Sequence, residues 1–526
     1  MKKIISLFLL TAMIFSCFAG CATEKVDVGT ITPEELDPEV IGYYSTLKLP
    51  IDTEGTTIKA FLKGETTDTP TDETPTIKEL SRRTGLNVQI ETAPTAVYAE
   101  KANIYMAAGK DLPDIIGEIN LNDFGVQGAM EPINKHLDEL PNLKEIFYDK
   151  TEEYKTKNMI KSLTAADGNI YEWPVWDTQR DVNYGFMYRK DIFDKHGLKM
   201  WNSNEEFYQT LKKLKQLYPE SSPWASKRGT LIFLECMGMW NIRSYKTWTP
   251  YYDEETKVWK QSLTDPKMKE ILDFLKKLFD EGLLDPEFLT MTEAAWTSKM
   301  IQNDKAFITF DFIGRLEQFS QQSTVPGYDL RYAKPIGNGR ERQLDRIWGN
   351  LGVTKSERSL KALKLLDYTI SESGAKLLTM GVEGKDFVRD EKGFAKYIGE
   401  VAETSKNLDE IEAKLGLFTA LSNRYDKKSN YYKFSEREQE AQDLINNVTG
   451  FNQLDPVLIF TSEEEDIKEE LQPAIQKAAE EFFTKYVLTD NTGDKAWAEW
   501  LTKMEKLGSD KLVKIYNDAQ VRFDKL

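Results

Sequence analysis

The chain has 526 residues, of which 29% are charged and 40% are hydrophobic, and its 86 acidic residues outnumber 69 basic ones to give a net charge of −17 at pH 7. This length is enough for several core-sized units, and the charged, acidic composition is typical of a soluble globular protein. Binding to nucleic acid or to anionic lipid would need a basic surface, so no nucleic-acid partner is expected.

The first 20 residues have the pattern of a lipoprotein signal peptide. Two lysines precede an apolar run over residues 4–15, and Phe18-Ala19-Gly20 then leads to Cys21. This order predicts cleavage before Cys21 and attachment of acyl chains such as palmitate to that cysteine, on the extracellular face of a membrane. The apolar run is shorter than the roughly 20 residues that cross a bilayer. Phe18 occupies a position where leucine is usual, so ordinary secretory cleavage remains the alternative.

Cysteine usage predicts no disulfide framework. The chain has three cysteines, of which Cys17 would be lost with the signal peptide and Cys21 would carry the lipid. Cys236 lies in an apolar segment, and we expect it to be a buried structural thiol rather than a reactive one.

The folded part is predicted to begin after an acidic, flexible tether over residues 21–52. Alternating apolar residues then predict a strand at 58–62, and a helix at 77–83 leads to a second strand at 87–91. This βαβ order implies a parallel sheet. A helix at 102–108 and a short buried strand at 113–116 continue the pattern.

Helix signals dominate the rest of the chain. Capping boxes are expected at residues 203–206 and 462–465, the second opening a long helix. Asp265 precedes Pro266 at the start of another predicted helix, which ends near Gly282. The predicted fold class is therefore α/β with extra carboxyl-terminal helices.

Catalytic and metal-binding patterns are weak. His136 and His196 are the two histidines of the chain, and neither has cysteine or acidic partners at metal-ligand spacing, which disfavours histidine-based catalysis and zinc. The Gly-rich stretch at residues 337–339 lacks the features of a phosphate loop. No cofactor or metal is expected, although residues 490–494 loosely resemble a calcium loop, so a structural calcium stays an alternative.

Aromatic residues lie beside acids or amides at four places that are expected to be loops or strand ends. These places are residues 171–177, 240–241, 310–312 and 348–350. Flat rings can cover the apolar faces of sugars, while carboxylates and amides form hydrogen bonds with hydroxyl groups. Each cluster alone could belong to a hydrophobic core, but the four together favour carbohydrate binding.

Four segments resemble, in the same order, those of a known family. Residues 107–116 are similar to its A-S-G-D-x-P-D-I stretch, and residues 166–174 to its D-G-K-I-Y-x-x-P stretch, with Asn169 in place of the usual lysine. Residues 188–198 resemble R-K-D-x-L-D-K-L-G-L, and residues 304–310 resemble its G-K-A-A-M strand. The chain is thus similar to the lipid-anchored extracellular solute-binding proteins of bacterial carbohydrate ABC importers, which are related to maltose-binding protein and common in Gram-positive bacteria.

This resemblance implies a two-lobed clamp that captures a sugar or oligosaccharide and delivers it unchanged to the permease of an ABC transporter. Residues 53–168 and 328–380 would form the amino-terminal lobe, and residues 169–327 and 381–526 the carboxyl-terminal lobe. The protein would be a monomer without enzymatic activity. By their position in the family's segments, eight residues would bind the ligand: Glu65, Glu118, Asn120, Trp173, Trp176, Asp177, Asp311 and Trp348.

Two alternatives stay open. A lipid-anchored enzyme acting on polysaccharide would need only two carboxylates about 5 to 9 Å apart, and a chain with 86 acidic residues can supply them. A solute-binding fold could also act in sensing or adhesion without transport. Acidic sugars are less expected than neutral ones, although Arg180, Arg189 and Arg315 could bind their carboxylates.

Overall fold

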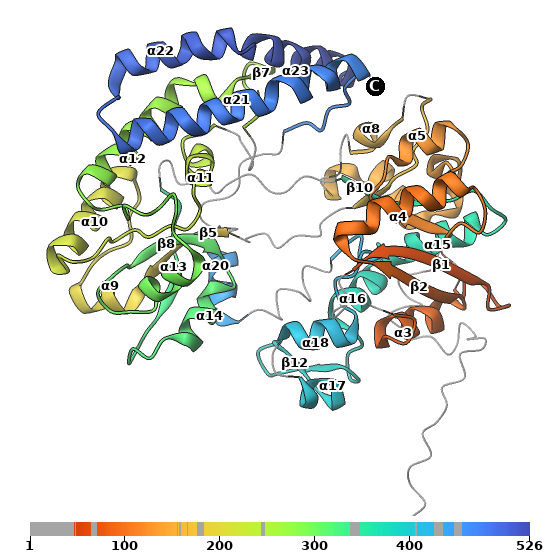
Figure 1. The fold of residues 1–526 in the computed structure, drawn as a ribbon. Coiled ribbons are helices and arrows are strands. Elements are labelled where there is room, and N and C mark those ends of the chain that lie inside the picture. The colour runs from red at the N-terminus through yellow and green to blue at the C-terminus, as the bar shows by residue number, and fades with distance from the viewer. Residues whose placement is uncertain are drawn as a thin grey trace, which may run out of the picture.

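The computed structural model describes residues 47, 49–64, 71–154, 156, 159–165, 167–175, 184–242, 248–336, 348–405, 408–425, 435–445 and 455–525. Within these residues the protein forms two lobes, each with its own sheet and helices (Figure 1). The predicted α/β, two-lobed fold with additional carboxyl-terminal helices is confirmed.

The first lobe is built on a five-stranded sheet in the order β2-β1-β3-β10-β4. β1 (Thr57–Lys63) pairs in parallel with β2 (Asn87–Ala93) and with β3 (Ile115–Gly117). β10 (Trp348–Val353) runs antiparallel to β3 and to β4 (Trp173–Val175). The predicted βαβ unit is confirmed, with α3 between β1 and β2.

Helices cover both faces of this sheet (Figure 1). The predicted helix at 102–108 is the second half of a longer helix, α4, whose first half buries Tyr98 alone. The first-lobe helices are α3 (Pro75–Thr84), α4 (Thr95–Ala108), α5 (Leu121–Val126), α6 (Pro141–Lys144), α7 (Thr151–Tyr154), α8 (Met159–Leu163), α15 (Ser359–Thr369), α16 (Glu372–Met380), α17 (Gly399–Thr404) and α18 (Leu408–Leu415). A hairpin of β11 (Phe387–Arg389) and β12 (Ala395–Tyr397) lies beside α17.

The second lobe is built on a three-stranded antiparallel sheet in the order β8-β5-β9. Its strands are β5 (Tyr184–Arg189), β8 (Ile308–Phe312) and β9 (Leu330–Tyr332), and a separate hairpin joins β6 (Tyr251–Asp253) to β7 (Val258–Lys260). Its helices are α9 (Lys190–His196), α10 (Asn204–Leu217), α11 (Leu231–Met239), α12 (Pro266–Asp280), α13 (Glu293–Met300), α14 (Arg315–Gln322), α20 (Glu436–Leu444), α21 (Ser462–Leu488), α22 (Gly493–Lys506) and α23 (Ser509–Phe523).

The predicted helix starts are close to those of the structure. Ser203 accepts a hydrogen bond from the backbone N–H of Glu206, and Asp265 accepts one from Lys267. The last predicted capping box is displaced by one residue, because Thr461, rather than the serine after it, exchanges hydrogen bonds with Glu464. Of the three helices that follow, α21 packs on α12, and α22 and α23 pack on α21 and on each other (Figure 1).

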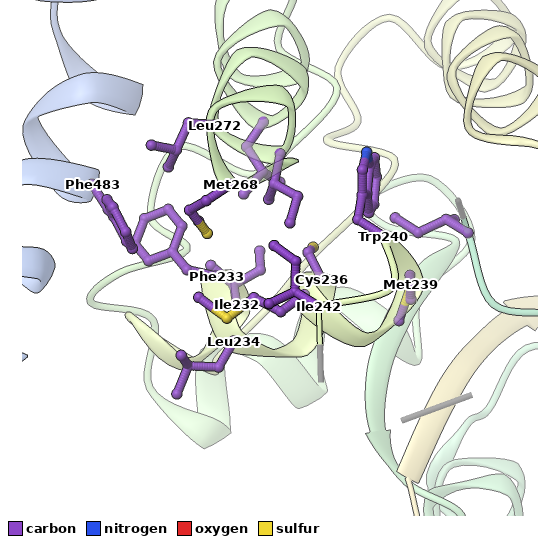
Figure 2. Packing of buried hydrophobic residues seen from close by; sticks show 14 of the residues in the cluster. Ile232, Phe233, Leu234, Cys236, Met239, Trp240, Ile242, Met268, Leu272 and Phe483 are labelled. Carbon is purple, nitrogen blue, oxygen red and sulfur yellow. The ribbon is translucent and has the colours of Figure 1, made fainter. Parts of the chain in front are cut away.

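Cys236 is buried, as predicted. It lies in α11 within the core of the second lobe, in the same buried cluster as Phe233, Met268 and Phe483 (Figure 2). Burial raises the pKa of its thiol, since the charged thiolate has no water to solvate it. The side chain therefore contributes to packing.

The division between the lobes differs from the predicted one at three places. β4 pairs with the first sheet and β9 pairs with the second, so each lies on the other side of a predicted boundary. Residues 381–425 pack on the first lobe, where the Thr76 hydroxyl donates to the Leu415 carbonyl at 2.8 Å and Arg424 donates to the Ile370 carbonyl at 2.9 Å. Strand pairing and these long-range contacts set the division, and neither is visible in local sequence patterns.

No helix among the described residues is both long and apolar enough to span a bilayer.

Candidate ligand-binding site

The chain passes between the lobes at the same edge of each sheet. It leaves the first lobe at the carboxyl end of β4 and enters the second at the amino end of β5, and it returns from β9 to the amino end of β10. The strand directions place these four ends at one edge of each sheet. The eight residues between Val175 and Tyr184 can span at most about 30 Å. The two edges therefore border a common region, where a ligand could contact both lobes.

The first-lobe edge carries an exposed ion pair. Lys63 ends β1, Glu118 follows β3, and the Lys63 Nζ lies 2.6 Å from a Glu118 carboxylate oxygen. Both side chains are more than a third exposed, so the pair contributes little to stability and its polar groups stay accessible. The buried Tyr98 hydroxyl joins these strands beneath the pair, since it donates to the Phe61 carbonyl at 2.8 Å and accepts from the Gly117 N–H at 3.2 Å.

Asn120 lies beside this pair as the amino-terminal cap of α5. Its Oδ1 accepts a hydrogen bond from the Asp123 N–H at 3.1 Å, and its Nδ2 donates to the Asp123 carboxylate at 2.7 Å. The side chain is exposed. It could contact a ligand with its remaining hydrogen-bonding capacity, or by giving up the bond to Asp123.

Two tryptophans belong to the strands at this edge. The Trp173 side chain is fully buried in the first-lobe core, and its indole N–H has no hydrogen-bond partner among the described residues. Trp348 pairs with Val175 through the backbone, which places it at the amino end of β10 next to the crossing. In this structure Trp173 therefore supports the edge from beneath.

The second-lobe edge carries a closed ring of four charges. Asp311, near the end of β8, is fully buried and accepts a hydrogen bond from Arg315 Nε at 3.0 Å, while Lys227 Nζ lies 3.4 Å from its other oxygen. Glu293 completes the ring. Its Oε1 lies 2.8 Å from the Arg315 Nη2, and its Oε2 lies 3.2 Å from the Lys227 Nζ. We call Lys227, Glu293, Asp311 and Arg315 the charge ring; its formal charges cancel.

The charge ring rests on a buried tryptophan. Trp296 presents its face to both cations, with Lys227 Nζ 4.4 Å and Arg315 Cζ 5.3 Å from the ring centroid. Its indole N–H donates to Thr309 of β8 at 2.9 Å, which fixes the indole to the strand that carries Asp311. Cation–π attraction and ion pairing thus hold the same two side chains from two directions.

Glu293 is the exposed member of the charge ring. Its side chain is 59% accessible, and the hydrogen bond from Lys227, together with the Arg315 charge, lowers the pKa of its carboxyl. A carboxylate kept ionised in this way is an acceptor for hydroxyl groups and a poor proton donor. Asp311 holds the two cations in place from the buried side.

An exposed aromatic platform lies at the same edge. Phe312 ends β8 with 39% of its surface accessible, and its ring centroid lies 3.9 Å from that of Tyr184, the residue opposite it in β5. The Arg228 guanidinium lies over the Tyr184 ring, with its Cζ 5.2 Å from the ring centroid. Arg228 also forms an ion pair with Glu235, in which Nε and the carboxylate oxygen are 2.6 Å apart. Phe312 and Asp311 are consecutive in β8, so their side chains point to opposite faces of the sheet, and the platform and the charge ring lie on the two sides of the same sheet edge. A flat, exposed ring is one of the features that sugar binding needs.

Comparison with known proteins identifies the family. A family model described as bacterial extracellular solute-binding protein matches residues 63–376, which is more than half of the chain. The chain belongs to this family of solute-binding proteins.

Relatives of this solute-binding protein occur in Bacillus subtilis (strain 168). The lipoprotein LipO is 24% identical over an alignment of 352 residues that covers 63% of this chain and 67% of LipO. The polygalacturonan/rhamnogalacturonan-binding protein YtcQ is 22% identical over 472 residues, covering 84% of this chain and 87% of YtcQ. Among solved structures, alginate-binding protein AlgQ2 without calcium ion has a TM-score of 0.64 and 21% identity, covering 90% of this chain and 99% of that chain. At this identity the structural likeness supports the fold.

Several predicted residues of the solute-binding protein lie outside the described residues: Cys21, Glu65, Trp176, Asp177 and Arg180. Of the others, Glu118, Asn120 and Asp311 lie at the two sheet edges that the crossing segments join. Arg189 lies at the opposite end of β5, buried between Asp191 and the ring of Tyr328, so it does not reach this region.

Sequence reasoning did not select the charge ring as a whole or the Phe312 platform. Phe312 was part of a noted aromatic cluster, but nothing in the sequence indicated that its ring lies exposed on top of Tyr184. Lys227 and Glu293 are far from Asp311 in sequence, and a single sequence carries no signal for their pairing. Among the described residues, no group of three or more His, Cys, Asp or Glu side chains is arranged to hold a metal ion.

Proposed function

We propose that this solute-binding protein captures an oligosaccharide between its lobes outside the cell and passes it unchanged to the permease of an ABC transporter. The observation that carries this proposal is that the chain crosses between two sheet edges that border a common region, one with the Lys63–Glu118 pair and the other with Glu293 and Phe312. The names of YtcQ and of AlgQ2, which refer to polysaccharide binding, agree with it.

The ligand would bridge the two edges. One sugar ring would lie on Phe312, the hydroxyls of a second unit would bond to Glu293 on the other side of the same sheet edge, and a further unit would reach Glu118 and Asn120 of the other lobe. Contacts made only when both lobes touch the ligand would favour the closed arrangement, which the permease would then recognise. Nothing in this step requires a proton donor, which is consistent with an ionised Glu293.

Membrane attachment belongs to the same proposal. Cleavage before Cys21 and acylation of that cysteine would hold the protein at the outer face of the membrane, with residues 21–52 as the tether. The relative named as a lipoprotein supports this part. The protein would act as a monomer, because one chain supplies both edges.

Thermal unfolding of the full-length protein against a panel of neutral and uronic-acid oligosaccharides tests the proposal. A ligand at 100 times its Kd should add about 2.7 kcal/mol to stability and raise Tm by a few degrees. Recovery of the sugar unchanged would support capture, whereas its consumption would establish the enzyme alternative. If no sugar shifts the transition, the carbohydrate proposal is wrong.

A matched pair of variants tests the site itself. Glu293→Gln should weaken binding about tenfold, because it removes a charged acceptor from the edge of the second lobe. Glu287→Gln is the control, since Glu287 is similarly exposed and similarly paired with a lysine but lies outside the charge ring. Equal effects of both variants would exclude Glu293 from the site. Uptake of labelled ligand by cells with and without the gene would separate transport from sensing.

A further inference from the structure

Two described contacts join the lobes without involving a residue of the candidate site. Lys161 Nζ of α8, in the first lobe, lies 5.8 Å from the centroid of the Phe523 ring in α23 of the second. Lys392 Nζ, in the hairpin of β11 and β12, lies 3.0 Å from a carboxylate oxygen of Glu436 at the start of α20. In Figure 1, α8 and the end of α23 lie at the top and β12 lies toward the bottom, so the contacts are on opposite sides of the molecule.

The Phe523 ring is held firmly by its own lobe. Within the two preceding turns, Asn517 and Gln520 accept hydrogen bonds from the backbone and indole N–H groups of Trp259, at 2.9 and 3.0 Å. Arg522 forms an ion pair with Glu464 of α21. Phe523 itself is 7% exposed. The end of α23 is therefore a fixed feature of the second lobe that extends to α8.

On the other side of this contact, α8 is attached to the strands that lead to the crossings. Met159 and Leu163 lie in the first-lobe core, and α8 packs against β4 and β10. These two strands carry the chain into and out of the segments that connect the lobes. The contact at Lys161 thus acts on the part of the first lobe that adjoins the connecting segments, where a rotation of one lobe against the other would start.

The second contact is an exposed ion pair, and the helix that carries Glu436 is fixed to the second lobe by other ion pairs. Lys392 and Glu436 are 70% and 71% exposed. α20 is joined to the body of the second lobe by Glu440, which pairs with Arg331 at 2.6 Å, and by Arg437, which pairs with Asp329 at 3.2 Å. Moving one lobe relative to the other would therefore separate Lys392 from Glu436.

Three of the four contact residues, Lys392, Glu436 and Phe523, lie beyond residue 376, where the family match ends. We propose that the part of the chain after residue 376 couples the lobes. Its two contacts set the equilibrium between lobe arrangements and so tune ligand affinity without touching the ligand. The apparent Kd depends on the fraction of molecules in the binding-competent arrangement, so a shift in that fraction changes affinity by the same factor.

Distances between spin labels on the two lobes test this coupling without a ligand. Labels at Asn103→Cys in α4 and Glu205→Cys in α10, both at exposed positions, would be measured in the full-length chain with Cys17→Ser and Cys21→Ser. Lys161→Gln, Phe523→Leu and Lys392→Glu should each change the ratio of lobe arrangements, by about twofold to fivefold. The combination of Lys161→Gln with Phe523→Leu should change it no more than either alone.

A charge swap and a control make the outcome decisive. Lys392→Glu combined with Glu436→Lys should restore the original distance distribution, which a merely misfolded variant cannot do. Lys514→Gln is the control, because Lys514 pairs with Asp518 within α23 and makes no contact with the first lobe among the described residues. The proposal is wrong if the contact variants behave like this control. It is also wrong if the effects of Lys161→Gln and Phe523→Leu on the ratio of lobe arrangements simply add. Because no sugar is present, this result is independent of the ligand assignment.

Discussion

Removal of the Phe312 ring is the sharpest test of the proposed site. Phe312 exposes 39% of its surface at the second-lobe edge, and the Tyr184 ring supports it from beneath. A phenylalanine side chain offers roughly 200 Å² of surface. The exposed part is therefore about 80 Å², and covering it with a sugar ring would contribute about 2 kcal/mol at 25 cal/mol per Å². We expect Phe312→Ala to raise Kd about 30-fold.

Calorimetric titration with the identified oligosaccharide measures this effect. Phe312→Tyr should bind almost as the original protein does, because it keeps the flat ring. Val258→Ala in β7 removes a side chain of similar exposure away from both sheet edges, and it should leave affinity unchanged. Full affinity in a folded Phe312→Ala variant would refute the platform, and an equal loss in Val258→Ala would show that the effect is not local.

Three further predictions concern buried groups. Asp311→Asn should lower the free energy of unfolding by about 3 kcal/mol in denaturant titrations, since it leaves Lys227 and Arg315 without their buried counter-charge; a loss below 1 kcal/mol would contradict this. Burial raises the pKa of Asp367 to about 7 although three groups of Asn142 and Leu143 donate to it. The folded state then binds more protons than the unfolded state between about pH 4 and 7, so stability should fall as pH rises through that range, by at most about 1.4 kcal/mol per pH unit, and Asp367→Asn should remove this slope. Cys236 should resist alkylation in the native protein and react only once denaturant unfolds the second lobe; rapid native labelling would contradict its burial.

Local signals predicted the helices better than the site. The caps at Ser203 and Asp265 were readable because a cap and its helix are neighbours in sequence. The burial of Trp173 was not readable, since it depends on β4 pairing with β10, which is far along the chain. The charge ring depends in the same way on loops that bring Lys227 and Glu293 to the end of β8. Three of the four aromatic clusters fall in or beside β4, β8 and β10, while residues 240–241 follow α11, and only strand pairing decides which rings face outward.

The central place of β10 in the first sheet has a consequence for how this protein forms after export. β10 lies between β3 and β4, so that sheet cannot close until residues 348–353 are available, well after the strands on either side of it. A chain emerging from the amino terminus would thus have an incomplete first lobe while most of the second is being delivered. Pairing over such sequence separations is slow. The topology itself delays premature folding, which would suit a chain exported before it folds, as the proposed location outside the cell requires.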